Sequence, residues 1–379
     1  MRVCQVNLQG HFGGGEVYTA VVCRALDRLG VESCLFAHPR ARYWEQMVIP
    51  ESTRIIRADS PEGIAARLPG GKAIILGHGP LPRAVLDARA QGRRHMAIAH
   101  MPLQGRDPRS FDGHERVFAV SGWVLEGLLA AGVPAWPEPL YGVADLSWRP
   151  SVTETRKRSR YDWDRRKLRD RLAGWVEPLL APFLPRPLFA RRTGLSLGVV
   201  SRLTPIKQFP HLFAILAPVL TRFPGVHLEI FGSGGYRSVR DLERALAPLG
   251  ERVRFWGEQP DVRAVYAHLD YLLAGLPEKE ALGLNVIEAQ FCDLPVLAVG
   301  APPFTETVSE GITGFLYRDP REDRGADFAR LIERVLAMPD RLHPARAEEH
   351  LERFSFDAFT ERIRRVLDAA QREFDAEAA

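Results

Sequence analysis

The sequence has no apolar run approaching the roughly 20 residues that a membrane-spanning helix needs. Its opening residues, 1–16, alternate like a short strand and lack the pattern of a secretory signal peptide. Cysteine is scarce, and the four cysteines show no spacing typical of a metal site. These absences argue against a membrane-embedded, secreted or zinc-binding protein. We expect buried thiols in a reducing cytoplasm.

The 379 residues are enough for two domains of ordinary size, each with its own core. The hydrophobic fraction of 46% and the charged fraction of 26% are typical of a globular protein. The net charge of +4 is unevenly distributed. Residues 156–192 hold twelve Lys/Arg and four Asp/Glu, a net charge of +8, which leaves about −4 for the rest of the chain.

Strand-like and helical patterns alternate along the chain, which predicts an α/β fold with parallel sheets. The predicted strands are residues 3–8, 31–37, 72–76, 95–99, 117–120, 197–200, 227–231, 252–256, 271–273 and 296–299. The predicted domains are residues 1–150 and 193–357, with an insertion at 151–192 and a last helix within 358–379.

Residues 276–295 carry the clearest chemical pattern: a tight turn and a helix, between the predicted strands 271–273 and 296–299. Gly283 permits a sharp turn and close approach of a ligand to the backbone. The unpaired peptide N–H groups at the start of the helix suit a phosphate. Glu280 precedes this turn and Glu288 lies about one helical turn beyond it. Two carboxylates on either side of a diphosphate site match the layout of a nucleotide-sugar.

Other residues could complete such a site. Arg202 and Lys207 lie five apart in a predicted turn, where a planar guanidinium and a point charge can converge on one diphosphate. The glycine-rich turn at 13–15 separates a strand from a helix, which also suits a phosphate or a sugar. Its spacing does not match a dinucleotide fingerprint, and a simple tight turn is the alternative.

Two predicted strands each end in a histidine, His78 and His100. Strands of parallel sheets present their carboxyl ends to the binding crevice. A histidine there can hydrogen-bond sugar hydroxyls, or act as an acid or base near neutral pH. A capping or core-edge role is the alternative for both residues.

The spacing from Glu280 to Glu288, followed by Ala289 and by Leu294-Pro295-Val296, resembles the donor motif of the retaining glycosyltransferases of family 4. The resemblance implies the GT-B fold: two Rossmann-like domains facing each other across a cleft, with the final helix packed back on the first domain. In that family the first Glu contacts the donor sugar and the second contacts the ribose.

The resemblance also implies roles for other positions. It places His100, with His78, on the acceptor side, with His100 beside the donor sugar. It implies catalytic roles for Glu280, His100, Arg202 and Lys207. The donor-binding positions that it implies are Gly13, Gly14, Arg202, Lys207, Gly232, Glu258, Glu280, Leu282, Gly283, Leu284 and Glu288. Ser201 and Gln208 stand where the family has glycines, and Ala301-Pro302 replaces a glycine pair.

These patterns predict a retaining glycosyltransferase that uses a UDP- or GDP-linked sugar, in glycan, lipopolysaccharide or glycolipid assembly. We expect neither a metal nor a cofactor. The departing phosphate itself would take the acceptor's proton in a front-face displacement. A non-catalytic nucleotide-binding or membrane-associated assembly protein on the same fold remains an alternative, as does a sugar-nucleotide epimerase.

The insertion at 151–192 lies where the family has a short linker. Its first half is basic with interleaved aromatics, and its second half is apolar and proline-rich. Residues 154–190 therefore suit an anionic membrane surface, a lipid-linked acceptor, or peripheral attachment to the inner face of the membrane. A solvated helix with one packed face is the alternative, and no nucleic-acid motif accompanies the charge.

Overall fold

The computed structural model describes residues 1–10, 12–88, 92–144, 154–163, 174–176 and 186–378. The chain forms two compact units. Unit 1 comprises Met1–Trp148 together with Glu349–Ala379, and unit 2 comprises Arg149–Glu348. Parts of the predicted insertion lie outside the described residues.

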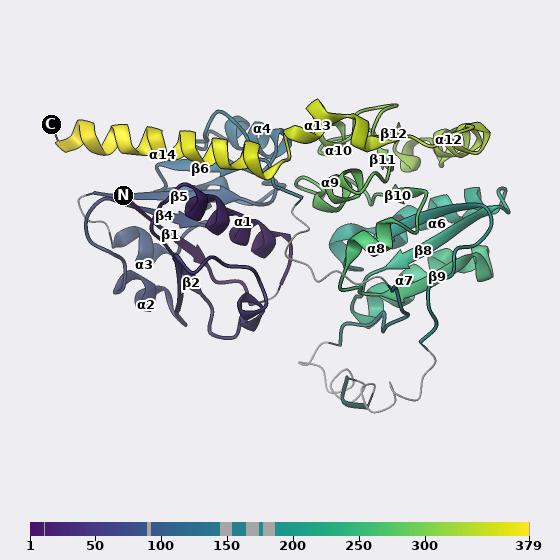
Figure 1. Ribbon diagram of the computed structural model, residues 1–379, viewed down its shortest axis with the longest axis horizontal. Coiled ribbons are helices and arrows are strands. Elements are labelled where there is room, and N and C mark those ends of the chain that lie inside the picture. Colours follow the sequence, from purple (N-terminus) through teal and green to yellow (C-terminus); the bar gives the residue numbers. More distant parts are fainter. Residues whose placement is uncertain (11, 89–91, 145–153, 164–173, 177–185, 379) are drawn as a thin grey trace. The chain divides into compact units, whose positions relative to one another are not determined.

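Unit 1 is built on a six-stranded parallel sheet in the order β3-β2-β1-β4-β5-β6 (Figure 1). Its strands are β1 (Arg2–Asn7), β2 (Ser33–Ala37), β3 (Thr53–Arg57), β4 (Ala73–Gly77), β5 (Arg93–Ala99) and β6 (Arg116–Ala119). The pattern of the sequence did not predict β3. This edge strand pairs only with β2 and is less buried than its neighbours, so its apolar signal is weak.

Helices connect and cover this sheet. They are α1 (Gly14–Arg28), α2 (Pro61–Ala65), α3 (Arg83–Asp87), α4 (Gly122–Ala130), α13 (Glu348–Glu352) and α14 (Phe356–Ala378), with short 3-10 turns η1 (Arg42–Glu45) and η2 (Pro108–Phe111). The last helix, α14, lies along unit 1 (Figure 1). Its Phe359 ring packs edge-on against Tyr18 of α1, and Lys72 pairs with Asp375 at 2.7 Å.

Unit 2 has a second six-stranded parallel sheet, in the order β12-β11-β10-β7-β8-β9. Its strands are β7 (Leu195–Val200), β8 (Val226–Phe231), β9 (Val253–Gly257), β10 (Tyr271–Leu273), β11 (Val296–Val299) and β12 (Gly314–Tyr317). Two six-stranded parallel sheets confirm the predicted α/β class. Most of their strands are almost wholly buried, as parallel strands between helices must be.

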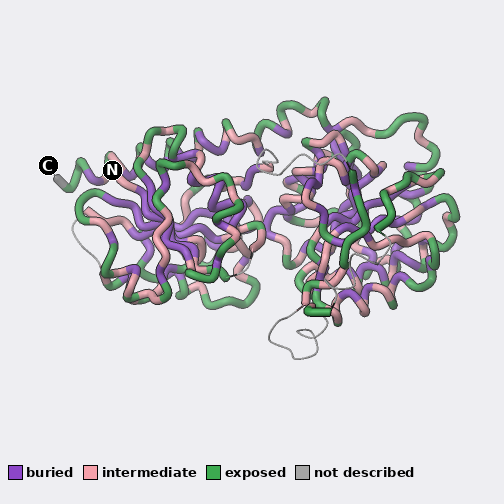
Figure 2. The backbone as a smooth tube through the Cα atoms, turned by 60° about the horizontal axis from the view of Figure 1, so that its bottom comes forward, coloured by how far each residue is buried: buried purple, intermediate pink, exposed green. Residues whose placement is uncertain are grey.

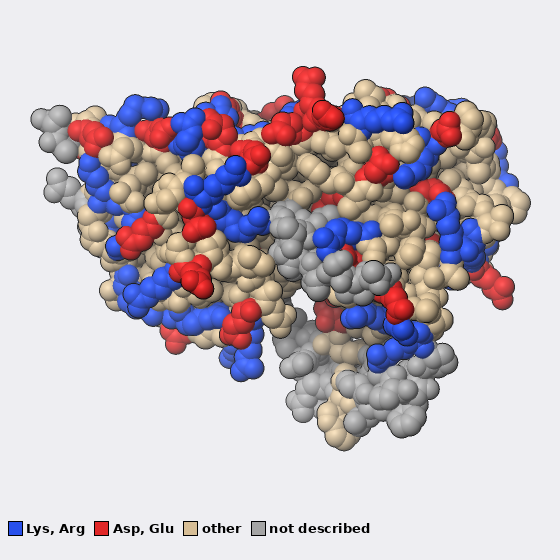
Figure 3. Space-filling view, in the orientation of Figure 1, with Lys and Arg blue, Asp and Glu red and all other residues tan. Residues whose placement is uncertain are grey.

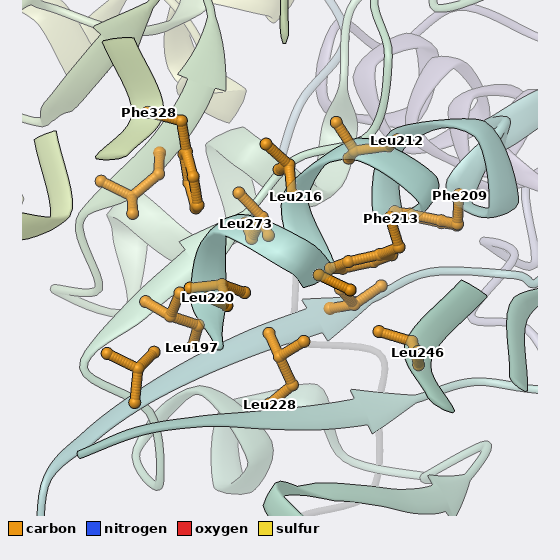
Figure 4. Close-up of a cluster of buried hydrophobic side chains, with 14 of the residues drawn as sticks. Leu197, Phe209, Leu212, Phe213, Leu216, Leu220, Leu228, Leu246, Leu273 and Phe328 are labelled. Carbon is orange, nitrogen blue, oxygen red and sulfur yellow. The ribbon is translucent and has the colours of Figure 1, made fainter. Parts of the chain in front are cut away.

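The helices of unit 2 are α6 (Phe209–Leu220), α7 (Tyr236–Leu246), α8 (Val262–Tyr266), α9 (Leu284–Phe291), α10 (Phe304–Thr307), α11 (Pro320–Asp323) and α12 (Ala326–Ala337). The 3-10 turns are η4 (Pro205–Lys207), η5 (Ala247–Arg252) and η6 (Pro344–Arg346). Figure 4 shows the core that α6 forms with the sheet, in which Phe213 and Leu216 are fully buried. Figure 2 shows the same arrangement along the chain, with buried strands and exposed connections.

None of the helices described is both long enough and apolar enough to pass through a bilayer. Acidic and basic side chains are interspersed over the surface shown in Figure 3. Along α14 the charges are paired with unit 1: Arg28 with Asp357, and Arg116 with Glu373. Such exposed pairs fix the position of a helix more than they stabilise it.

Candidate functional site

The turn before α9 presents unpaired backbone donors. Gly283 is the N-cap of α9 and has φ 82° and ψ 59°, in the left-handed region that favours glycine. A Cβ there would lie 3.1 Å from the ring of Phe304. Among the described residues, no acceptor faces the peptide N–H groups of residues 282–285. These donors, at the positive end of the helix, suit an anion, and the predicted phosphate site at this helix start stays a prediction.

Glu280 and Lys207 lie beside that predicted site and form an ion pair with each other. Their side chains are 18% and 23% exposed, so a ligand can still reach both. Lys207 ends η4, just after β7, and its carbonyl oxygen lies 2.9 Å from where a Cβ at Gly275 would stand. The sequence assigned Lys207 to a diphosphate and Glu280 to a sugar. The structure adds that the two side chains are partners of each other.

Glu288 lies on α9 and is held by a residue that sequence reasoning missed. The Tyr266 hydroxyl, at the end of α8, is 3.2 Å from the Glu288 carboxylate and 3.3 Å from the carbonyl oxygen of Asn285. The Asn285 side chain in turn donates to the carbonyl oxygen of Val200 at 3.0 Å, which ties α9 to the end of β7. No spacing in the sequence relates Tyr266 or Val200 to α9.

The loops after β7 and β8 are in close contact. Gly232 has φ 135°, and a Cβ there would lie only 1.9 Å from the carbonyl oxygen of Ser201. The Leu203 N–H donates to the carbonyl oxygen of Ser233 at 2.8 Å. Arg202 lies between these contacts with an exposed side chain. Hence Arg202 and Gly232 belong to one pair of loops at the carboxyl ends of two neighbouring strands.

Glu258 follows β9 and accepts a hydrogen bond from the Ser233 hydroxyl at 3.3 Å. This contact joins the loops after β8 and β9. The structure therefore brings Arg202, Gly232 and Glu258 to the same edge of the sheet. Convergence of Arg202 and Lys207 on one diphosphate stays a prediction.

The first part of the insertion packs against loops of unit 2, a contact that the sequence did not predict. The Arg158 N–H donates to the carbonyl oxygen of Trp256 at 2.9 Å, and the Asp162 N–H donates to that of Gly234 at 2.8 Å. A Cβ at Gly257 would meet the Ser159 carbonyl oxygen at 2.3 Å. Residues 154–163 thus lie against the loops that follow β8 and β9, which carry the predicted donor-binding positions Gly232 and Glu258.

In unit 1, the glycine turn leads directly into α1. Gly13 is the N-cap and Gly14 the first helical residue, with no side-chain cap. Asn7, at the end of β1, donates to the Thr19 hydroxyl at 2.9 Å, and Glu16 is buried nearby. Gly13 has an extended φ of −169°, so its backbone does not require glycine. Contact of Gly13 and Gly14 with a diphosphate or an acceptor stays a prediction.

His78 and His100 follow β4 and β5, and their rings contact each other. His78 Nδ1 is 3.0 Å from His100 Nε2, and the rings stack with centroids 5.3 Å apart. Burial lowers the pKa of His100 to about 4. Burial, and then the neighbouring His100, lower the pKa of His78 well below its ordinary value. Both imidazoles are therefore neutral near pH 7, which favours hydrogen bonding over the predicted acid role for His100.

One sequence pattern is relevant to whether the protein binds a metal ion. Asp162-Trp163-Asp164 has the Asp-x-Asp spacing of a metal-binding motif, but Asp164 lies outside the described residues. Across the described ranges, no three His, Cys, Asp or Glu side chains converge on a point that could hold a cation.

Residues 194–338 match the family model described as glycosyl transferases group 1. The chain is 34% identical over 216 residues to the D-inositol 3-phosphate glycosyltransferase of Nocardia farcinica. This match covers 54% of the present chain and 45% of that relative. The chain thus aligns with less than half the length of the curated relatives that it resembles.

Solved structures resemble the whole chain. Sucrose-phosphate synthase from Thermosynechococcus elongatus superposes with a TM-score of 0.71 at 16% identity, covering 99% of each chain. Anabaena HepE in complex with UDP superposes with a TM-score of 0.69 at 19% identity, covering 97% of this chain and 100% of that one. At such identities the likeness shows the fold, and it confirms the predicted GT-B architecture of two parallel-sheet domains.

Proposed function

We propose that this chain, whose residues 194–338 belong to the group 1 glycosyltransferases, transfers a sugar from a nucleotide-sugar to an acceptor hydroxyl with retention. The observation that carries the proposal is the start of α9. There, N–H groups that face no acceptor among the described residues lie beside Lys207 and between two carboxylates, those of Glu280 and Glu288. A diphosphate with a sugar at one end and a ribose at the other satisfies all of these groups.

The proposed chemistry depends on the charge of the leaving diphosphate, which changes during the reaction. As the sugar–phosphate bond breaks, negative charge builds up on the leaving diphosphate. The helix N-terminus, Lys207 and Arg202 stabilise that charge, and electrostatic stabilisation of this kind usually accelerates a reaction more than any other single effect. Glu280, freed from Lys207 by the phosphate, orients the sugar. The phosphate oxygen takes the acceptor's proton on the same face, so the anomeric configuration is retained and neither a metal nor a cofactor is needed.

The donor we favour is a UDP-sugar, with a GDP-sugar as the alternative. Solved structures of the same fold include Anabaena HepE bound to UDP and to UDP-glucose. The acceptor we favour is a small polyol or a lipid-linked sugar in glycan or lipopolysaccharide assembly. Relatives and structural neighbours include a D-inositol 3-phosphate glycosyltransferase and a lipopolysaccharide outer core galactosyltransferase.

Two measurements test this proposal. A thermal-shift screen with UDP, GDP and their sugars should give stabilisation by one base series, about 2.7 kcal/mol for a ligand at 100 times its Kd. Release of the nucleoside diphosphate should then depend on added acceptor, and the anomeric coupling of the product should show retention. Turnover that survives EDTA supports metal independence. Inversion, or failure of every nucleoside diphosphate to bind, would end the proposal.

One feature favours the non-catalytic alternative. Gln208, where the family has glycine, adopts a left-handed φ of 55° and its side chain donates to Glu278 at 3.3 Å. A side chain in this conformation is strained, and here it occupies part of the loop beside Lys207. Tight nucleotide binding with no turnover across donors and acceptors would favour an assembly factor. Conversion of the donor without any acceptor would instead indicate an epimerase.

For the insertion we propose contact with an anionic membrane surface on the cytoplasmic side. Lys157 and Arg158 are exposed, and Trp175 is 71% exposed. Exposed cations and an exposed indole in the same insertion suit lipid headgroups. Deleting the insertion is a poor test, because residues 154–163 pack on unit 2. The double variant Lys157→Ser/Arg158→Ser is better, with Arg237→Ser/Arg244→Ser on α7 as the matched control for charge.

The wild-type protein and the control should sediment with phosphatidylglycerol vesicles at low salt and detach as salt rises. The Lys157/Arg158 variant should bind more weakly by about 1 kcal/mol per lost charge. Equal binding by the two double variants would reject the membrane role of this segment.

A further inference from the structure

A chain of hydrogen bonds links the centre of unit 1 to the carboxyl end of β5. Gln5 lies on β1 and is fully buried. Its Nε2 donates to the Cys23 sulfur on α1 at 3.1 Å, and its Oε1 lies 2.9 Å from His78 Nε2. His78 Nδ1 then lies 3.0 Å from His100 Nε2. Each contact involves one defined atom of each partner.

The chemistry of these atoms determines where the protons are. An amide oxygen only accepts hydrogen bonds, so His78 must carry its proton on Nε2. The Nδ1 atom of a neutral His78 is then an acceptor, so His100 must carry its proton on Nε2. That leaves His100 Nδ1 with a lone pair and without a hydrogen-bond partner among the residues described.

We propose that Gln5 and His78 are positioning residues that hold His100 in its Nε2–H tautomer, so that His100 Nδ1 accepts a hydrogen bond from a hydroxyl group of a sugar ligand. The identity of the ligand rests on the proposed function. The tautomer does not, since it follows from contacts within unit 1 alone.

The surroundings support a fixed, neutral ring. Tyr18 packs edge-on against His100 with centroids 4.9 Å apart, and its hydroxyl donates to the Leu140 carbonyl oxygen at 2.8 Å, so it does not compete for the imidazole. Burial keeps the pKa of both histidines below the neutral range. A neutral acceptor binds a hydroxyl hydrogen, whereas an imidazolium would donate instead.

The opposite orientation of the Gln5 amide is the alternative that must be tested, because it would reverse every donor and acceptor in the chain. It would place the Gln5 amide hydrogens against His78, and His100 would then carry its proton on Nδ1 and act as a donor. Two-bond ¹H–¹⁵N correlation spectra of protein with ¹⁵N-labelled histidine distinguish the two tautomers directly. His100→Asn and His78→Asn assign the signals.

At pH 7 we expect the Nε2–H tautomer for His78 and His100 in the wild-type protein. In Gln5→Met, which has a similar shape and no amide, both tautomers of the two rings should be populated. Gln5→Glu retains an acceptor oxygen and should restore the single tautomer. A wild-type His100 in the Nδ1–H or doubly protonated form overturns the proposal without any variant, and so does a tautomer unchanged in folded Gln5→Met.

UDP-glucose is the probe for the ligand, and its addition should shift the His100 Nδ1 resonance. Gln5→Met should lower kcat/KM for transfer about tenfold, which corresponds to the loss of one hydrogen bond in the transition state. Gln5→Glu should recover part of this loss. UDP-glucose that binds and leaves His100 Nδ1 unshifted overturns the hydroxyl contact. UDP-glucose that fails to bind at all overturns UDP-glucose as the ligand of His100. The proposed function falls only if every nucleoside diphosphate fails to bind, and the tautomer is read independently of both.

Discussion

At the residue scale, the ion pair between Lys207 and Glu280 connects the predicted phosphate and sugar contacts. In the structure each side chain neutralises the other. If the proposed function holds, a phosphate that draws Lys207 away would release Glu280 for the sugar, so binding of one end of the donor would prepare the site for the other. We infer that the two residues act as a unit, and their effects on catalysis should not be additive.

The corresponding prediction concerns Lys207→Met. This change removes a cation from the leaving-group site and should lower kcat about 10²–10³-fold. Glu280→Gln should act mainly through sugar placement, and the double variant should be no worse than the more damaging single variant. Nucleoside diphosphate release is the assay. Lys279→Met, at an exposed lysine next to Glu280, is the matched control and should retain full activity. Full activity in Lys207→Met would contradict the assignment.

The histidine pair makes stability depend on pH. The folded-state pKa of His100, about 4, lies below the ordinary value of 6.5. Between these values the unfolded chain binds a proton that the folded chain does not. The contribution of His100 to stability is therefore unaffected above pH 6.5 and falls as the pH drops toward 4, by about 3 kcal/mol. Urea unfolding should show a shallower fall in His100→Asn. The matched variant at exposed His211 on α6 should follow the wild type.

At the element scale, close approach of loops determines where the site residues lie. The loops after β7 and β8 approach within a distance that only glycine at position 232 allows. The insertion adds a third segment, whose backbone lies against Gly234 and Gly257. A buried carboxylate, Glu229, receives Arg192 from the end of the insertion at 3.1 Å and Arg254 from β9 at 2.6 Å. The insertion is thus anchored to unit 2 at both of its ends.

Gly232→Ala tests this arrangement. The new Cβ would collide with the Ser201 carbonyl oxygen in a backbone region that L side chains rarely adopt. We expect a loss of about 3 kcal/mol in the free energy of unfolding of unit 2, and weaker nucleotide binding. Gly235→Ala, three residues further on, meets nothing within 4 Å and should cost much less. Equal unfolding curves for the two variants would contradict the close contact between the loops after β7 and β8.

At the scale of the whole molecule, unit 1 is made of two segments that are far apart in the sequence, one from each end of the chain. Unit 1 is completed by α14, which the chain reaches only after it has built unit 2. Ile363, Val366 and Leu367 of α14 line a small apolar cavity together with residues of β1, α1 and β4. The stability of the first unit therefore depends on the last residues of the sequence.

Truncation after residue 355 tests this dependence. Removing α14 exposes the apolar surface that it covers, so calorimetry should show the unit 1 transition at much lower temperature or absent. Unit 2 should still be stabilised by the nucleoside diphosphate that binds the full chain. Truncation after residue 375, which leaves Phe374 in place, is the control and should be nearly neutral. Unchanged melting of the shorter chain would refute the role of α14.

Much of this protein could be predicted from local patterns. Most strands were identifiable because parallel strands are buried on both faces and read as apolar runs, while the edge strands β3 and β12 were not among those predicted. Gly283, Glu280 and Glu288 could be placed on a turn and a helix because a helix start has recognisable chemistry within about ten residues. The family resemblance supplied roles that no local pattern contains, and those roles remain to be measured.

The sequence by itself determined the α/β architecture, and it predicted the glycine turn before α9 and the candidate histidines, since each depends on neighbours in the chain. Only the tertiary structure decided that Lys207 pairs with Glu280, that Tyr266 holds Glu288, and that Gln5 and His78 orient His100. These partners lie 73, 22, 73 and 22 residues apart, in that order. Contacts across such separations arise from packing of whole elements, and packing leaves no local trace in the sequence.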